Sequence, residues 1–182
     1  QEEVPLVLVL SVEGPLTPSW VEYLERGLRI AGQRDTDLVI FEINTPGGSV
    51  TLMQELVAMM RASEIPIVVY VTPRGAMAAS AGTVITLAGH AAAMAPETII
   101  GAASPVGAQG EDLGETIQAK EKNALKAQVR TLAARRGEEA IALAEATIEE
   151  ATAVSSEEAL EIGLVDFIAV DVHSLLSQLD GH

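Results

Sequence analysis

The sequence predicts an α/β domain in which a mostly parallel sheet is surrounded by helices. Two observations indicate this class: β-type apolar runs alternate with helix-type segments, and their spacing suits right-handed βαβ units. The composition agrees, because 48% of the 182 residues are hydrophobic and only 3% are aromatic, as expected for a layered α/β core. We see no internal repeat or domain boundary and therefore expect one domain over residues 1–182.

Apolar runs of strand length recur along the chain. The predicted strands are Val4–Val12, Leu38–Ile43, Ile65–Val71, Ala91–Ala95, Thr98–Ala102 and Leu164–Val170. The first run is almost continuously apolar rather than alternating, which predicts a strand that is buried on both faces.

Caps and apolar stripes mark the helices between these runs. Two predicted helices begin at Thr17 and near Ser80, and the others are Ser49–Ala62, Ile117–Arg136, Glu138–Thr152, Ser155–Gly163 and Asp171–Leu179. Pro18 fits the first helical position after an N-cap at Thr17, and Ser155 with Glu158 forms a capping-box pattern. The remaining stretch, Pro105–Thr116, has three glycines and three acidic residues, which predicts a mobile loop beside the functional site that orders on substrate.

Charge and composition exclude several classes of function. A formal net charge of −15 argues against nucleic acid and against an anionic membrane surface as direct partners. The absence of cysteine excludes disulfides, thiol catalysis and Cys-ligated zinc. The three histidines are far apart in the sequence, so we expect no metal site and no cofactor. No apolar run reaches the roughly 18 residues that span a bilayer.

A turn of very small residues, Arg74–Thr83, carries a single serine, Ser80, at its centre. Small side chains let backbones approach closely, and the start of a helix stabilises negative charge. This environment suits a nucleophilic serine on a strand-to-helix turn. A serine at a helix start is also a common cap, and the turn alone leaves both roles open.

A second turn, Asn44–Ser49, follows the second predicted strand and contains the pair Gly47 and Gly48. Paired glycines can present unobstructed N–H groups to a developing oxyanion. The alternative is a glycine turn that only reverses the chain.

Together the two turns resemble the ClpP/crotonase superfold, a spiral of βαβ units in which a Pro-Gly-Gly turn supplies oxyanion donors and a small-residue turn carries the nucleophile. The match extends to the NfeD family, membrane-associated Ser-Lys proteases related to signal peptide peptidase A. The segments that carry this resemblance are Ile43–Gly48, Pro73–Gly75, Ala78–Thr83, Met94–Pro96 and Ile100–Ala102.

The resemblance implies a serine endopeptidase that cleaves apolar segments of membrane-associated proteins such as stomatin-like partners. Ser80 would be the nucleophile, and the oxyanion donors would be N–H groups of Gly47 or Gly48 and of Ala81. We further expect three residues to contact substrate: Ser49, which also caps a helix, Met77 and Ser104. The family implies membrane attachment through segments absent from this chain, an extracytoplasmic catalytic domain, a soluble fragment here, and a homodimer or larger homo-oligomer.

A serine nucleophile also needs a general base to accept its proton. The ClpP protease uses a histidine after its serine helix, but Ile99–Ser104 contains none. A lysine can serve if burial lowers its pKa, and the three lysines are Lys120, Lys122 and Lys126. The spacing of the three lysines along the predicted helix does not identify which of them is the base. The family pattern places the base three residues before an asparagine, which fits Lys120, with Lys122 as second choice.

Two other functions share this fold. A crotonase-type enzyme would act on a CoA thioester and would need a catalytic carboxylate and cations for the CoA phosphates, but only Arg74 lies near Ser80 in sequence. A non-catalytic binding scaffold would retain the fold without using Ser80.

Overall fold

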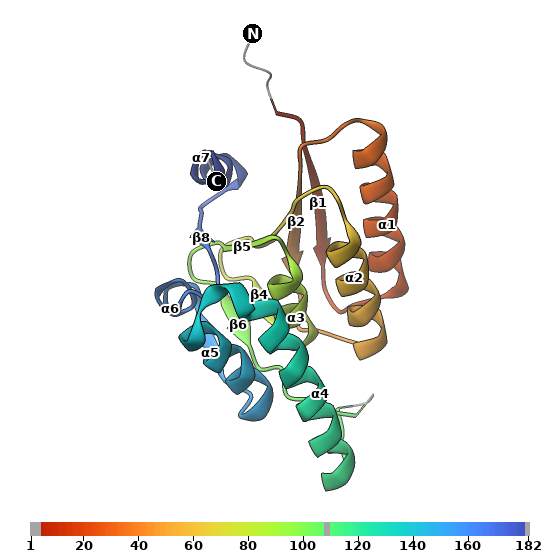
Figure 1. The fold of residues 1–182 in the computed structure, drawn as a ribbon, viewed down its shortest axis with the longest axis vertical. Coiled ribbons are helices and arrows are strands. Elements are labelled where there is room, and N and C mark those ends of the chain that lie inside the picture. Colours follow the sequence, from red (N-terminus) through yellow and green to blue (C-terminus); the bar gives the residue numbers. More distant parts are fainter. Residues whose placement is uncertain (1–4, 108–109, 181–182) are drawn as a thin grey trace.

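The computed structural model describes residues 5–107 and 110–180 of the chain (Figure 1). Its main sheet has five strands in the order β1-β2-β3-β5-β8, and every neighbouring pair is parallel. The strands are β1 Val7–Glu13, β2 Leu38–Asn44, β3 Ile67–Val71, β5 Ala91–Met94 and β8 Phe167–Ile168. The predicted α/β class with a mostly parallel sheet is confirmed.

A smaller sheet lies beside the main one and has the order β4-β6-β7. Its strands are β4 Met77–Ala79, β6 Ile99–Gly101 and β7 Ala153–Ser155. The pair β4–β6 is parallel, and β6–β7 is antiparallel. A single bridge between Thr45 and Ala78 joins the end of β2 to β4. This bridge brings the glycine turn after β2 next to the serine turn after β4.

The helices begin and end close to the predicted positions. They are α1 Pro18–Gln33, α2 Val50–Ala62, α3 Ala81–Ala88, α4 Glu115–Ala133, α5 Glu138–Glu149, α6 Ser156–Ile162 and α7 Val172–Leu179, with a 3-10 turn at Ala134–Arg136. The predicted capping box is formed: the Ser155 hydroxyl accepts from the Glu158 N–H at 3.2 Å, and the Glu158 carboxylate accepts from the Ser155 N–H at 2.8 Å. Thr17 occupies the N-cap position before Pro18 but makes no side-chain cap bond.

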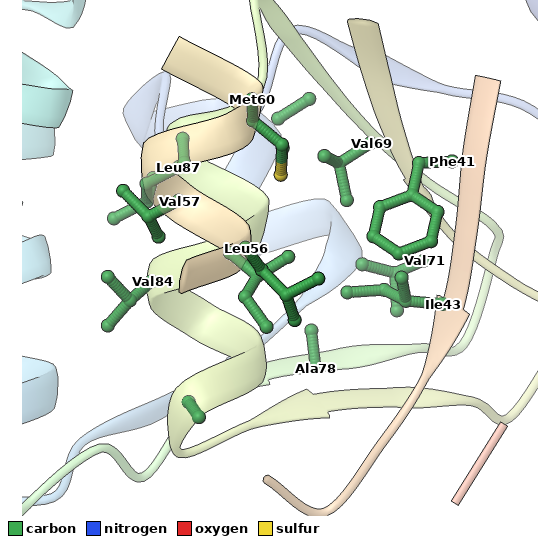
Figure 2. Close-up of a cluster of buried hydrophobic side chains, with 14 of the residues drawn as sticks. Phe41, Ile43, Leu56, Val57, Met60, Val69, Val71, Ala78, Val84 and Leu87 are labelled. Atoms are coloured by element: carbon green, nitrogen blue, oxygen red, sulfur yellow. The ribbon is translucent and has the colours of Figure 1, made fainter. Parts of the chain in front are cut away.

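The larger hydrophobic core lies between one face of the main sheet and helices α1, α2 and α3. Phe41 and Val69 point from the sheet toward Leu56 and Met60 of α2 (Figure 2). All eight residues of α3 are buried, so the helix that starts after Ser80 is held on every side. The opposite face of the sheet packs against α7 through a second, smaller cluster around Tyr70.

The prediction for the first strand is wrong in one respect. Strand β1 is an edge strand rather than a strand buried on both faces, and Val9 is 40% exposed. A continuous apolar run fixes the tendency to form a strand, but the position in the sheet depends on which partners pair with it. The first residue of the predicted run, Val4, lies outside the described residues.

An ion pair with a buried arginine links the 3-10 turn after α4 to the residue before strand β8. Arg136, whose side chain is 2% exposed, donates to the two carboxylate oxygens of Asp166, both at 2.9 Å. Removing one partner leaves an uncompensated buried charge. We expect Asp166→Ala to lower the free energy of unfolding by about 3 kcal/mol, measured by urea denaturation. Arg74→Ala, which breaks the exposed pair with Glu97, is the control and should have a much smaller effect. Equal costs for the two variants would contradict the expectation.

Candidate active site

Ser80 sits on a strained turn between strand β4 and helix α3. Its backbone has φ 53° and ψ −122°, a region that non-glycine residues rarely adopt and that is typical of functional turns. The turn is held by the Ser80 N–H, which donates to the Gly101 carbonyl at 2.9 Å, and by the Ser80 carbonyl, which accepts from the Thr83 N–H at 2.9 Å. Although Ser80 is at the N-cap position, its hydroxyl makes no cap hydrogen bond. The Ser80 side chain therefore does not cap helix α3.

The glycine turn packs directly against Ser80. A Cβ atom added at Gly47, where φ is 109°, would lie 2.5 Å from the Ser80 Cβ, and one at Gly48 would lie 2.8 Å from the Leu16 Cβ. The Gly47 N–H donates to the Thr45 hydroxyl at 3.0 Å. Among the described residues, the N–H groups of Gly48 and Ala81 have no acceptor. These two N–H groups are the better candidates for an oxyanion site.

A cavity of about 550 Å³ opens at this junction. Ser80, Ala81, Gly48 and Ser49 line it, and its apolar wall consists of Val50, Met53, Val84, Val106, Leu113 and Leu125. Glu121 is the one carboxylate among the described lining residues, and no lysine or arginine is among them. Cations for the phosphates of CoA are thus missing from the described wall, which disfavours the crotonase-type alternative.

Two of the expected substrate-contacting residues do not line this cavity. Met77 lies in strand β4, where it pairs with Ile99. The Ser104 hydroxyl donates to the carbonyl of Ile148 in helix α5, and Ser104 is not among the residues that line the cavity. Ser49 does line the cavity and also caps α2, as its hydroxyl accepts from the Leu52 N–H at 3.4 Å.

The structure separates the three lysines by their partners. Lys122 Nζ donates to the Glu149 carbonyl at 2.7 Å, and Lys126 Nζ lies 3.0 Å from the Glu149 carboxylate. The hydrogen bond and charge of Lys126, followed by the charge of Lys122, lower the pKa of Glu149. Lys120 is exposed and does not line the cavity, although its neighbour Glu121 does. The structure therefore does not bring Lys120 to Ser80, and the burial expected of a lysine base is absent in this arrangement.

Lys120 belongs to the exposed part of α4. From Glu115 to Ala124 every residue is exposed except Gln118 and Lys122, which are half-buried. This end of the helix extends away from the rest of the fold (Figure 1). Gly107 and Gly110, which lie in the preceding loop on either side of the two residues that are not described, line the cavity.

His90 is not part of this site. It follows the far end of α3, and its Nδ1 accepts a hydrogen bond from the Ile67 N–H at 3.0 Å. Burial, and then the charges of Arg61 and Arg135, lower the pKa of this imidazole. Within residues 5–107 and 110–180, no group of three His, Cys, Asp or Glu side chains could hold a metal ion, and no helix is both long and apolar enough to cross a membrane.

The contact between Gly47 and Ser80 predicts a strong effect of a single methyl group. We expect Gly47→Ala to slow the modification of Ser80 by a fluorophosphonate by about 10²-fold or more, because shifting reacting groups by about 1 Å costs this much. The added Cβ would also meet the Ala79 carbonyl oxygen at 3.1 Å, and a backbone atom cannot move aside cheaply. Gly137→Ala is the control, since Gly137 has a similar φ of 95° but open space around it. Equal modification rates of the two variants would contradict this packing.

Comparisons with known proteins give consistent matches along the chain. The family model described as NfeD1b, N-terminal domain, matches residues 6–181. The membrane-bound protease PH1510 of Pyrococcus horikoshii is 36% identical over 178 residues, which is 97% of this chain and 40% of that protein. The membrane protein NfeD1b of Bacillus subtilis is 35% identical over 116 residues, 64% of this chain and 26% of that protein. The chain therefore spans less than half of either curated relative.

Solved structures agree with the fold. A lysine-to-alanine mutant of the 1510-N membrane-bound stomatin-specific protease, in complex with a substrate peptide, has a TM-score of 0.89 and 34% identity, covering 98% of this chain and 82% of that one. A serine-to-alanine mutant of the same protease has a TM-score of 0.88 and 33% identity, covering 98% and 86%. ClpP1 from Listeria monocytogenes, at 18% identity and a TM-score of 0.73 over 92% and 94% of the two chains, supports the fold alone and confirms the expected ClpP-like architecture.

Proposed function

We propose that this chain, which belongs to the NfeD1b N-terminal domain family, is the catalytic domain of a serine endopeptidase with a Ser-Lys dyad. Ser80 occupies a strained strand-to-helix turn in contact with Gly47, next to two N–H groups, of Gly48 and Ala81, that lack acceptors among the described residues. A nucleophile beside preorganised donors is the arrangement that acyl transfer requires.

The reaction follows from these groups. The Ser80 Oγ bonds to the carbonyl carbon of the scissile peptide bond, and its proton passes to a neutral Lys120 amine. The N–H groups of Gly48 and Ala81 donate to the oxyanion of the tetrahedral intermediate. The C–N bond then breaks, and the ammonium of Lys120 gives its proton to the leaving amine. Water, deprotonated by the same lysine, hydrolyses the acyl-enzyme to a carboxylic acid and free Ser80.

Lys120 is proposed as the base because the other two lysines are engaged elsewhere. The ammonium groups of Lys122 and Lys126 both donate hydrogen bonds to Glu149 of α5. The solved structure of a related protease in complex with a substrate peptide is that of a lysine-to-alanine mutant, which supports a functional lysine in this family. We propose that the exposed end of α4 approaches Ser80 when a peptide enters the cavity, because Lys120 is exposed in this structure.

The wall of the cavity supports an apolar substrate. Six aliphatic side chains and Pro46 and Pro105 face it, while Glu121 is the charged residue among those described. We propose that the substrate is an apolar segment of a membrane-associated protein, since the related 1510-N protease is called stomatin-specific. We further propose membrane association through parts of the protein outside this chain, a catalytic domain outside the cytoplasm, and a homo-oligomeric state.

A pair of peptides tests this function. The chain is incubated with an apolar peptide rich in Val and Leu and with a peptide of equal length in which Ser and Gln replace these residues, and the products are identified by mass spectrometry. We expect cleavage of the apolar peptide, slower cleavage of the polar one, and none by Ser80→Ala. Cleavage of both peptides at equal rates would contradict the apolar preference. Cleavage of neither would favour the non-catalytic scaffold.

A further inference from the structure

Thr45 stands between the glycine turn and the serine turn and contacts both. It is fully buried, and it forms the one residue-to-residue bridge between β2 and β4 among the described residues, opposite Ala78. Its N–H donates to the Met77 carbonyl at 2.7 Å, and its carbonyl accepts from the Ala79 N–H at 3.0 Å. The backbone of Thr45 is thereby fixed to the strand that leads into Ser80.

The two branches of the Thr45 side chain contact the two halves of the site. The hydroxyl accepts the Gly47 N–H at 3.0 Å, with a longer contact of 3.4 Å to the Gly47 carbonyl. The methyl group lies against Gly82 in the first turn of α3. A Cβ atom built on Gly82 would be only 2.7 Å from this methyl group. Threonine is the residue type that offers a hydroxyl and a methyl group from the same Cβ atom.

These contacts decide which N–H groups are available to an oxyanion. With the Gly47 N–H occupied by Thr45, the next N–H along the turn, that of Gly48, is left without an acceptor among the described residues. The methyl group packs this turn against the first turn of α3, which carries the Ala81 N–H. Oxyanion donors contribute only when they are aimed at the charge that develops.

We propose that Thr45 is a positioning residue: its hydroxyl takes up the Gly47 N–H and so directs the Gly48 N–H to the oxyanion together with that of Ala81. This inference rests on the proposed serine-protease function. It predicts that the hydroxyl matters for the rate of the chemical step rather than for substrate binding, because an oxyanion exists only after Ser80 has attacked.

Three variants of the whole chain test the role of Thr45 in peptide cleavage. Thr45→Val replaces the hydroxyl by a methyl group of similar size, and we expect kcat to fall by about 10²-fold with KM nearly unchanged. Thr45→Ser keeps the hydroxyl, and we expect it to keep kcat within about threefold of the wild type, in line with the modest cost of one buried methyl group. Circular dichroism and urea denaturation establish that each variant is folded under the assay conditions.

If Thr45→Val does not fold, the double variant Thr45→Ala with Gly82→Ala takes its place. The new Cβ at residue 82 fills much of the space of the lost methyl group, so this variant also removes the hydroxyl with less loss of packing, and the same fall in kcat is expected. A hydroxyl-free variant that is folded and keeps wild-type kcat would overturn the proposal. So would a Thr45→Ser variant impaired as severely as Thr45→Val. An inactive wild type would refute the proposed function instead, which is a distinguishable result.

Discussion

Replacing Ser80 by alanine is expected to lower kcat/KM for an apolar peptide by at least about 10⁴-fold, because removing a catalytic serine leaves only binding and oxyanion effects. The fold should persist. Ser80 makes no cap hydrogen bond through its side chain, and alanine can occupy the same strained φ of 53° at a similar cost. Peptide cleavage followed by mass spectrometry, together with urea denaturation, measures both effects.

Two further variants separate catalysis from packing at this turn. Ser49→Ala removes the other serine that lines the cavity; it should cost some stability, because Ser49 caps α2, while most activity remains. Ser80→Gly should be inactive but more stable than Ser80→Ala by about 1 kcal/mol, since glycine relieves a positive φ. An active Ser80→Ala variant would show that Ser80 is not the nucleophile. If Ser49→Ala were inactive in the same assay, Ser49 would be the serine to assign instead.

Replacing Lys120 by alanine is expected to lower the rate of peptide cleavage by about 10²-fold or more, while Lys122→Ala keeps most of the activity. General-base catalysis is worth about this much, and a serine hydroxyl is a weak nucleophile without it. Since the Lys120 side chain is exposed, its removal should not change the urea midpoint. Cleavage rates at a series of pH values, with urea denaturation of each variant, give the comparison.

Lys122 is the matched control for this prediction because it lies two residues away on the same helix. Its ammonium is bonded to Glu149, so Lys122→Ala should loosen the contact between α4 and α5 and lower stability slightly. Full activity of Lys120→Ala with an inactive Lys122→Ala would show that the second-choice lysine is the base. If neither substitution affects cleavage, Ser80 is not activated by either of these lysines.

The sequence was sufficient for the main sheet because its strands lie within apolar runs that helical segments separate, although β8, Phe167–Ile168, is much shorter than the predicted run Leu164–Val170. Strands β4 and β7 were not predicted, since each has only three residues and β4, Met77–Ala79, has no β-branched side chain. Their existence depends on partners far away in the chain: β7 pairs with β6 about fifty residues earlier. Pairing at such a distance overrides local propensity.

The candidate site was predictable from the sequence at positions where the backbone geometry of a turn requires a glycine or another small residue. Gly47, Gly48 and Ser80 were identified because close approach and strained backbone favour glycines and small-residue turns. The sequence did not choose between Gly47 and Gly48 as the oxyanion donor, and the hydrogen bond from the Gly47 N–H to Thr45 favours Gly48. A threonine two residues before a glycine is a local turn signal that could have indicated it. The exposed position of Lys120 and the orientation of Ser104 depend on packing among α4, α5 and the loop.

Covalent trapping of the nucleophile tests the central claim most directly. The chain is treated with a fluorophosphonate, and intact mass and peptide mapping give the site and rate of modification at several pH values. We predict one adduct, on Ser80, that forms faster as pH rises through a single ionisation and at least about 10²-fold more slowly in Lys120→Ala. Modification of a different residue, or an unchanged rate and pH profile in Lys120→Ala, would contradict a serine hydroxyl activated by an uncharged lysine.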